Sequence, residues 1–174
     1  MQRYSPDKQS GLYFLKEKGE NAGRKKMKAY ERLLKYVTVW TTSDENSTMV
    51  PTTKRQLDLG NLLVEEMKEM GLSDVSMDEY GYVYGYLPAT EGMEDVAPLG
   101  LIAHLDTAPD FNGQNVKPQI IPDYNGEDVV LGTSGRVLAV KDFPRLKGYK
   151  GRTLITTDGT SLLGPMTRPG LQRS

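Results

Sequence analysis

The chain has 174 residues, with 22 Lys and Arg against 23 Asp and Glu, one histidine and no cysteine. A chain of this length buries about 70% of its unfolded surface, so we expect one α/β domain with a real core. Without cysteine, a metal would have to be held by histidine and carboxylates. No stretch approaches the ~18 apolar residues of a membrane span, and no secretory signal is evident, so we expect a soluble, cytoplasmic protein.

The charge balance changes at Met27. Residues 1–26 contain seven Lys or Arg and three Asp or Glu, whereas residues 27–174 contain 15 and 20. The first 26 residues show neither helical nor strand periodicity, and we interpret them as disordered or as a spurious N-terminal extension. Because the rest of the chain is acidic and has no basic stripe, neither nucleic acid nor a membrane is expected as a partner.

Two helices are predicted in the first part of the body, because apolar side chains recur there at helical spacing. They are Tyr30, Leu33, Leu34 and Val37 in the first helix, and Leu59, Leu63, Met67 and Met70 in the second. We expect a cap at Thr52 or Thr53 before the second helix and a left-handed C-cap at Gly71 after it.

Short strands are predicted after the second helix. Alternation of apolar and polar residues indicates a strand over 75–77, and the tyrosine-rich run 81–86 is typical of a half-buried strand. Further short strands are expected at 119–121, 128–132 and 153–158. A different pattern, PLGLIAH, is continuous and apolar, which favours a strand buried on both faces of a sheet.

That apolar run ends at His104, the only histidine. At the carboxyl end of a strand, His104 would lie where ligands of open α/β sheets gather. Asp106 is two residues further and would point to the same side. A carboxylate is the usual partner that orients a metal-bound imidazole, so the pair is a candidate metal site. Against this, His-x-Asp is a common spacing, and a lone histidine is more often a polar residue that closes a strand.

The stretch LDTA, residues 105–108, offers a different chemistry. It resembles the Asp-Thr-Gly signature of aspartic proteases, in which two carboxylates share a proton. Ala108 stands at the glycine position and Pro109 follows it, so the backbone freedom of that signature is missing. An aspartic-type protease is therefore a remote alternative.

Four stretches together resemble the N-terminal part of the peptidase T family: 27–72, 102–121, 124–132 and 153–164. The resemblance implies a cytoplasmic tripeptide aminopeptidase with two zinc ions, related to the aminoacylase and carboxypeptidase type of metallopeptidase. It also implies the fold, which would be the incomplete N-terminal part of a zinc-exopeptidase catalytic domain. Such a domain is α/β, with a mixed, mostly parallel sheet flanked by helices.

The resemblance assigns roles to two residues. His104 matches the first histidine zinc ligand, and Asp106 matches the aspartate counted as catalytic because it orients that ligand. The family's remaining ligands and its glutamate base match no position here. We therefore expect at most a partial zinc site and no activity from this chain alone. The alternative is a non-enzymatic remnant or a weak metal-binding half-site. Oligomeric state and substrate side-chain preference are not predicted.

The resemblance divides the chain into an extension at 1–26, the N-terminal part of the catalytic domain at 27–164, and an aberrant tail at 165–174. After LLG the family continues with GADDKAG, but this chain reads GPMTRPGLQRS. A back-translation of the tail with one G added after the codon GGC for Gly164 encodes GADDKAGLAEI. We interpret the tail as frame-shifted and expect resequencing of that junction to find one additional base. A clean read without it would refute the frameshift.

Overall fold

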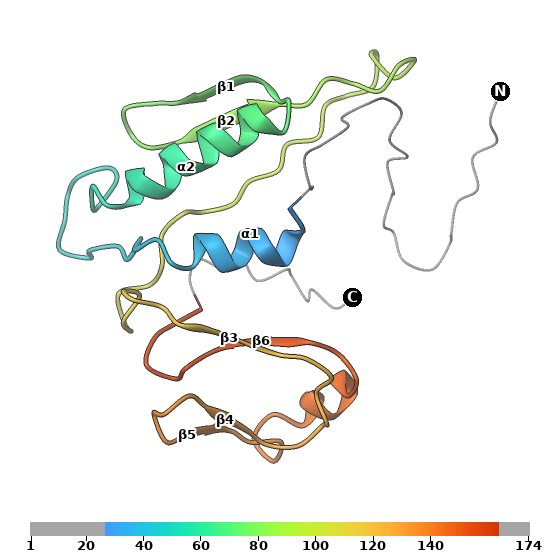
Figure 1. The fold of residues 1–174 in the computed structure, drawn as a ribbon. Coiled ribbons are helices and arrows are strands. Elements are labelled where there is room, and N and C mark those ends of the chain that lie inside the picture. The colour runs from blue at the N-terminus through green and yellow to red at the C-terminus, as the bar shows by residue number, and fades with distance from the viewer. Residues whose placement is uncertain (1–26, 164–174) are drawn as a thin grey trace.

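The computed structural model describes residues 27–163, so the expectations for residues 1–26 and for the tail lie outside the described residues. The elements appear in Figure 1 in chain order. They are α1 (Ala29–Tyr36), α2 (Gln56–Glu69), β1 (Ser73–Met77), β2 (Val83–Tyr86), β3 (Pro118–Ile121), β4 (Val129–Leu131), β5 (Arg136–Leu138), the 3-10 helix η1 (Pro144–Tyr149) and β6 (Leu154–Thr157). Both predicted helices are confirmed, and so are the short strands predicted over 75–77, 81–86, 119–121, 128–132 and 153–158, whereas β5 and η1 were not anticipated.

The two ends of α2 illustrate what local sequence determines. Gly71 adopts a φ of 85°, which confirms the predicted left-handed C-cap. The predicted cap at Thr52 or Thr53 is wrong, because α2 begins at Gln56 after Arg55 and no side chain caps it. The hydroxyl of Thr53 donates instead to the carbonyl of Thr42, 3.0 Å away. A long-range contact therefore replaces the local cap.

The first structural unit consists of α2 and the antiparallel hairpin of β1 and β2, which pack against each other (Figure 1). A methyl group added at Gly60 of α2 would lie 2.5 Å from the sulfur of Met77 in β1, so helix and hairpin approach closely at that glycine. On β2, Val83 is half-buried while Tyr84 and Tyr86 are exposed. The tyrosine-rich run is thus a strand with one face packed on a helix, as its alternation predicts.

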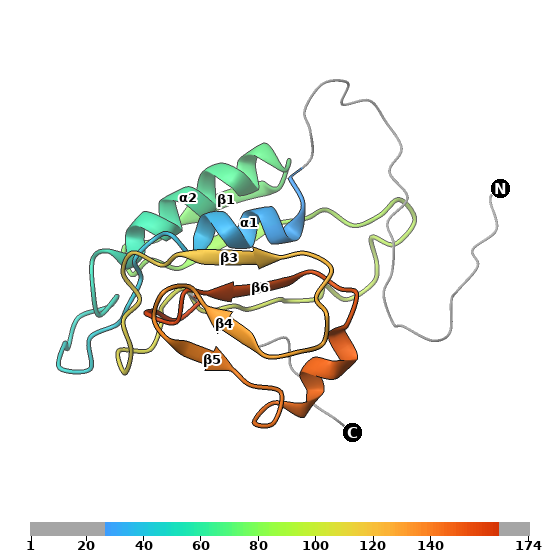
Figure 2. The same cartoon turned by 60° about the horizontal axis from the view of Figure 1, so that its bottom comes forward.

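The second unit contains two antiparallel pairs, β3 with β6 and β4 with β5, together with η1 (Figure 2). Its small core is formed by the buried side chains of Tyr124, Val129 and Leu146. Partly buried apolar side chains surround them: Ile121, Leu131, Leu138, Val140 and Leu154. Helix α1 contacts this unit as well, because Tyr30 lines an apolar cleft together with Ile120 and Ile155.

The expected mostly parallel sheet is not seen in residues 27–163, where every strand pair is antiparallel and each sheet has two strands. A single isolated bridge, between Thr42 and Thr107, is parallel. The helices and small sheets still place the described part of the chain among mixed α and β structures. No helix in that part is both long and apolar enough to cross a bilayer.

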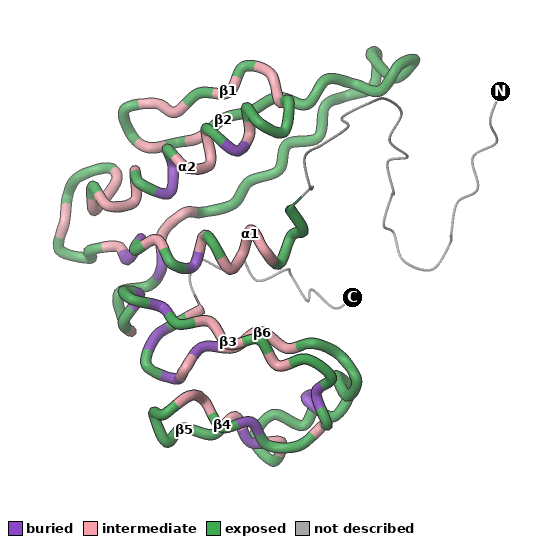
Figure 3. Tube along the Cα trace, in the orientation of Figure 1, coloured by how far each residue is buried: buried purple, intermediate pink, exposed green. Residues whose placement is uncertain are grey.

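The run at 98–104 departs most from expectation, because it forms no strand. Leu99, Leu101 and Ile102 are 85%, 88% and 99% exposed, and Figure 3 shows the whole stretch as an exposed connection. The physical reason is the absence of a partner: a buried strand needs neighbours that satisfy its backbone groups and cover both faces. Since no described segment supplies them, the prediction of a buried strand is wrong for this structure.

We therefore predict that the 174-residue chain self-associates through this apolar run, since unpaired backbone and apolar side chains favour intermolecular pairing. Leu101→Lys should weaken self-association by about tenfold, because burying one leucine contributes roughly 1.5–3 kcal/mol. Light scattering against concentration measures the effect. Met93→Lys adds the same charge at an exposed position outside the run and should change little. Equal association of Leu101→Lys and the unmodified chain would contradict the prediction.

The two helices are joined through one buried carboxylate. Glu66 of α2 is 5% exposed and accepts hydrogen bonds from three side chains of α1. The donors are Arg32 Nη1 and Lys35 Nζ, each at 2.6 Å, and the hydroxyl of Tyr36. Burial by itself raises the pKa of Glu66, but the bonds from Lys35, Tyr36 and Arg32 outweigh it, and the pKa lies below its ordinary value.

Because the folded-state pKa of Glu66 is lowered, its contribution to stability is complete above the unfolded pKa of about 4.3 and is lost as pH falls through the folded value. Glu66→Gln should lower the free energy of unfolding by about 1–3 kcal/mol near neutral pH and flatten the loss on acidification. Urea unfolding at several pH values measures both. The control Glu65→Gln changes an exposed, adjacent carboxylate and should cost under about 0.5 kcal/mol. Similar losses for both variants would contradict the assignment.

Candidate functional site

His104 and Asp106 are in direct contact. The Nδ1 atom of His104 lies 3.0 Å from Oδ1 of Asp106, and the two side chains are 55% and 41% exposed. When the imidazole is neutral, the carboxylate accepts from Nδ1–H, which fixes the tautomer and leaves Nε2 with its lone pair free to bind a ligand. Asp106 thus pairs with an imidazole. The aspartic-protease alternative requires a pair of carboxylates instead.

The position of the pair differs from the one inferred from sequence. His104 was expected at the carboxyl end of a buried strand, but it lies in an extended segment that forms no strand. The pair is positioned instead by the residue that follows it. Thr107 is 4% exposed, and its backbone forms the isolated bridge between this segment and Thr42.

Residues 41–43 hold the backbone of Thr107 on both sides. The amide of Thr107 donates to the carbonyl of Thr41 at 3.2 Å, and the amide of Ser43 donates to the carbonyl of Thr107 at 3.0 Å. The hydroxyl of Ser43 donates to the same carbonyl, also at 3.0 Å. This is the pattern of a short parallel ladder, and it fixes the backbone immediately after Asp106.

Arg55 secures residues 41–43 from the other side. Its Nε and Nη2 donate to the carbonyl of Thr42 at 2.8 and 2.6 Å, and its guanidinium lies 3.9 Å from the centroid of the Trp40 ring. These contacts combine two charge-assisted hydrogen bonds with a cation–π interaction. Sequence reasoning missed Arg55 and Trp40, because they come from a loop and the turn before α2, and no spacing rule connects them.

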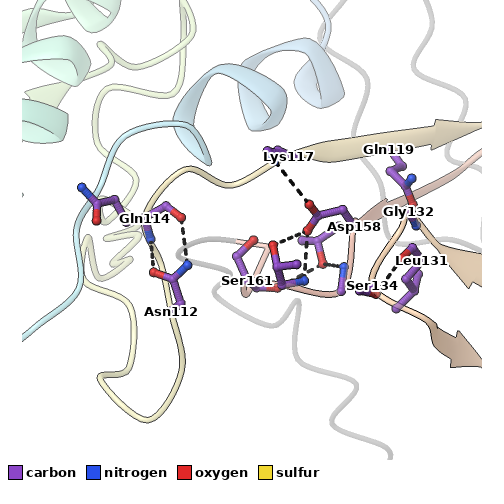
Figure 4. A network of polar contacts seen from close by, with 12 residues as sticks. Asn112, Gln114, Lys117, Gln119, Leu131, Gly132, Ser134, Asp158 and Ser161 are labelled. Atoms are coloured by element: carbon purple, nitrogen blue, oxygen red, sulfur yellow. Dashed lines mark hydrogen bonds and ion pairs between the residues drawn. The ribbon is translucent and has the colours of Figure 1, made fainter.

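The loop that follows Thr107 meets the end of the described chain. The amide of Leu162 donates to the carbonyl of Asn112 at 3.0 Å. Asn112 and Gln114 are themselves joined by two hydrogen bonds, of 3.1 and 3.0 Å (Figure 4). The segment that begins with LLG therefore starts beside the loop after Asp106.

A polar network around Asp158 fixes the turn that precedes Leu162 (Figure 4). The Asp158 carboxylate accepts from the hydroxyl and the amide of Thr160 at 2.6 and 2.9 Å and lies 4.0 Å from Lys117 Nζ. The Thr160 hydroxyl and amide, with a smaller effect of Lys117, hold the pKa of Asp158 below its ordinary value. A carboxylate that is ionised and bonded to its own turn is a structural group.

Within residues 27–163, no group of three or more His, Asp or Glu side chains is arranged to hold a metal ion. Zinc sites use at least three protein ligands. The described residues therefore offer His104 as a single imidazole ligand, with Asp106 to orient it.

Comparison with known proteins gives relatives at high identity. Peptidase T of Clostridium acetobutylicum is 54% identical over 142 residues, which cover 81% of this chain and 35% of the relative. Peptidase T of Bacillus licheniformis is 52% identical over 147 residues, covering 84% and 36%, and that of Aliivibrio salmonicida is 51% identical over 141 residues, covering 81% and 34%. No protein-family model matches the chain.

The chain is therefore homologous to a family of peptidases. Within that family, its similarity is to the proteins named peptidase T, and it spans about a third of the length of the curated relatives it matches. The resemblance inferred from the stretches around HLDTAPDF and LLG is thereby confirmed.

Proposed function

We propose that the protein to which this sequence corresponds is a cytoplasmic, zinc-dependent tripeptide aminopeptidase that releases the N-terminal residue of short peptides. The observation that carries the proposal is the identity of 54% to a peptidase T over a stretch that includes most of the chain. The contact between His104 and Asp106 supports it independently, since a metallopeptidase needs an imidazole ligand held in one orientation.

The two residues fit the zinc chemistry that the resemblance implies. His104 would hold the metal through Nε2, because Asp106 occupies Nδ1 at 3.0 Å. Asp106 would keep the ring in the required tautomer and raise the basicity of the ligand. When bound, zinc polarises a carbonyl oxygen and lowers the pKa of a coordinated water. The described residues would then contribute one oriented ligand, and the other ligands would come from the longer family sequence.

The path of the chain supports a site whose remaining ligands come from the longer family sequence. Leu162 lies beside Asn112, in the loop that follows Asp106, so the described chain ends against that loop. The resemblance implies the continuation GADDKAG, whose first aspartate would be a further zinc ligand. The longer sequence would also supply strand partners for 98–104, which would extend the parallel contact of Thr42 with Thr107 into the mostly parallel sheet expected from the resemblance.

The first test of the proposal is activity after restoring the reading frame into a family-length protein. That protein should hydrolyse tripeptides with added zinc, whereas the 174-residue chain should not, because residues 27–163 hold no group of three metal ligands. His104→Ala in the frame-restored protein should abolish hydrolysis and lower the bound zinc measured by elemental analysis. Full activity of His104→Ala, or turnover by the purified 174-residue chain free of family-length enzyme, would contradict this account.

The second test concerns Asp106. Asp106→Ala in the frame-restored protein should leave the circular dichroism spectrum unchanged and reduce zinc affinity or activity by ~10 to 100-fold, as expected when the residue that orients a ligand is removed. Asp110→Ala removes an exposed carboxylate four residues away and serves as the matched control. If the two variants bind zinc equally well, Asp106 does not orient a ligand.

A further inference from the structure

The side chains of His104 and Asp106 are 55% and 41% exposed, and residues 98–103 before them are exposed. Exposed side chains on an unpaired segment sample many rotamers, so a contact between them needs a fixed backbone nearby. The residue next to Asp106 supplies one, because Thr107 is buried and hydrogen-bonded on both sides of its peptide unit.

The side chain of Thr107 is held as firmly as its backbone. Its hydroxyl lies 3.1 Å from the hydroxyl of Thr42, and both residues are buried. Trp40 Nε1 donates to the Thr42 hydroxyl at 3.0 Å. Because an indole N–H only donates, Trp40 occupies an acceptor position of Thr42 Oγ1. The hydroxyl proton of Thr42 is therefore available to donate to Thr107.

Gly113 closes this contact from the opposite side. A methyl group at Gly113 would lie 2.4 Å from the hydroxyl oxygen of Thr42 and 2.9 Å from that of Thr107. Both distances are shorter than a real carbon–oxygen contact allows, and the obstructing atoms are short, buried side chains that cannot swing away. Only glycine permits the loop after Asp106 to fold back against the two threonines.

We infer that the hydroxyl pair of Thr42 and Thr107, with Gly113 packed over it, positions Asp106 against Nδ1 of His104. These are positioning residues that act through Asp106. The inference deepens the proposed function, because it gives the ligand His104 a support that extends through Thr42 to Arg55. A purely structural role would instead stabilise the fold without affecting which nitrogen of His104 carries the proton.

The single histidine makes the test direct. In the ¹⁵N-labelled 174-residue chain, the Nδ1 and Nε2 chemical shifts of His104 report its tautomer, measured about two pH units above the ordinary imidazole value of ~6.5. The unmodified chain should show the Nδ1–H form, and Asp106→Asn defines the shifts without the carboxylate. Thr107→Val and Gly113→Ala should each move both shifts toward the Asp106→Asn values.

Three controls separate positioning from general damage. Thr107→Ser keeps the hydroxyl and should retain the original tautomer. Thr157→Val removes another buried hydroxyl, one that donates to the carbonyl of Ser161, and should leave the His104 shifts unchanged. In the Asp106→Asn background, Thr107→Val should produce no further change, because the effect passes through Asp106. Amide dispersion shows which variants fold, and Thr107→Ser keeps the comparison possible if Thr107→Val does not.

The inference is overturned if folded Thr107→Val and Gly113→Ala keep the original shifts, or if Thr157→Val moves them equally. It is also overturned if Thr107→Val has the same effect with and without the carboxylate of Asp106. None of these readings involves zinc or turnover. The tautomer shifts could therefore behave as expected in a protein that hydrolyses no peptide, and failure of one proposal is distinguishable from failure of the other.

Discussion

The pairing of residues 41–43 with Thr107 is the contact on which the candidate site depends. It is the single parallel bridge recorded within the described chain, and it joins the loop between α1 and α2 to the segment that carries His104 and Asp106. Arg55 and Trp40 secure one side of it, and the loop at Gly113 packs over the other. This contact supplies the backbone hydrogen bonds next to an exposed pair of side chains.

The exposed apolar run and the partial coverage of the relatives have a common explanation under the proposed function. Leu101 and Ile102 are almost fully exposed, although their sequence pattern is typical of a strand buried on both faces. The chain matches about a third of each relative, so the family sequence contains far more residues than those described here. Residues 98–104 thus have the sequence of a buried strand, but no described segment covers them.

Local patterns predicted local structure well. The helical stripe over 59–70 and the glycine after it gave α2 and its left-handed end, and alternation gave β1 and β2. What failed depends on contacts between distant segments: the cap at Thr53, whose hydroxyl donates to Thr42, and the strand at 98–104, which has no partner. For the site, the spacing of His104 and Asp106 indicated their contact. The support from Arg55 and Gly113 comes from residues far apart in the sequence, so a spacing pattern cannot predict it.

The central claim is that His104, oriented by Asp106, is a zinc ligand. The most direct measurement is a crystal structure of the frame-restored protein with zinc. The account predicts His104 Nε2 at about 2.0–2.1 Å from a zinc ion, with Asp106 still bonded to Nδ1. Zinc bound elsewhere with His104 outside its coordination sphere, or bound through Nδ1 with Asp106 displaced, would contradict it.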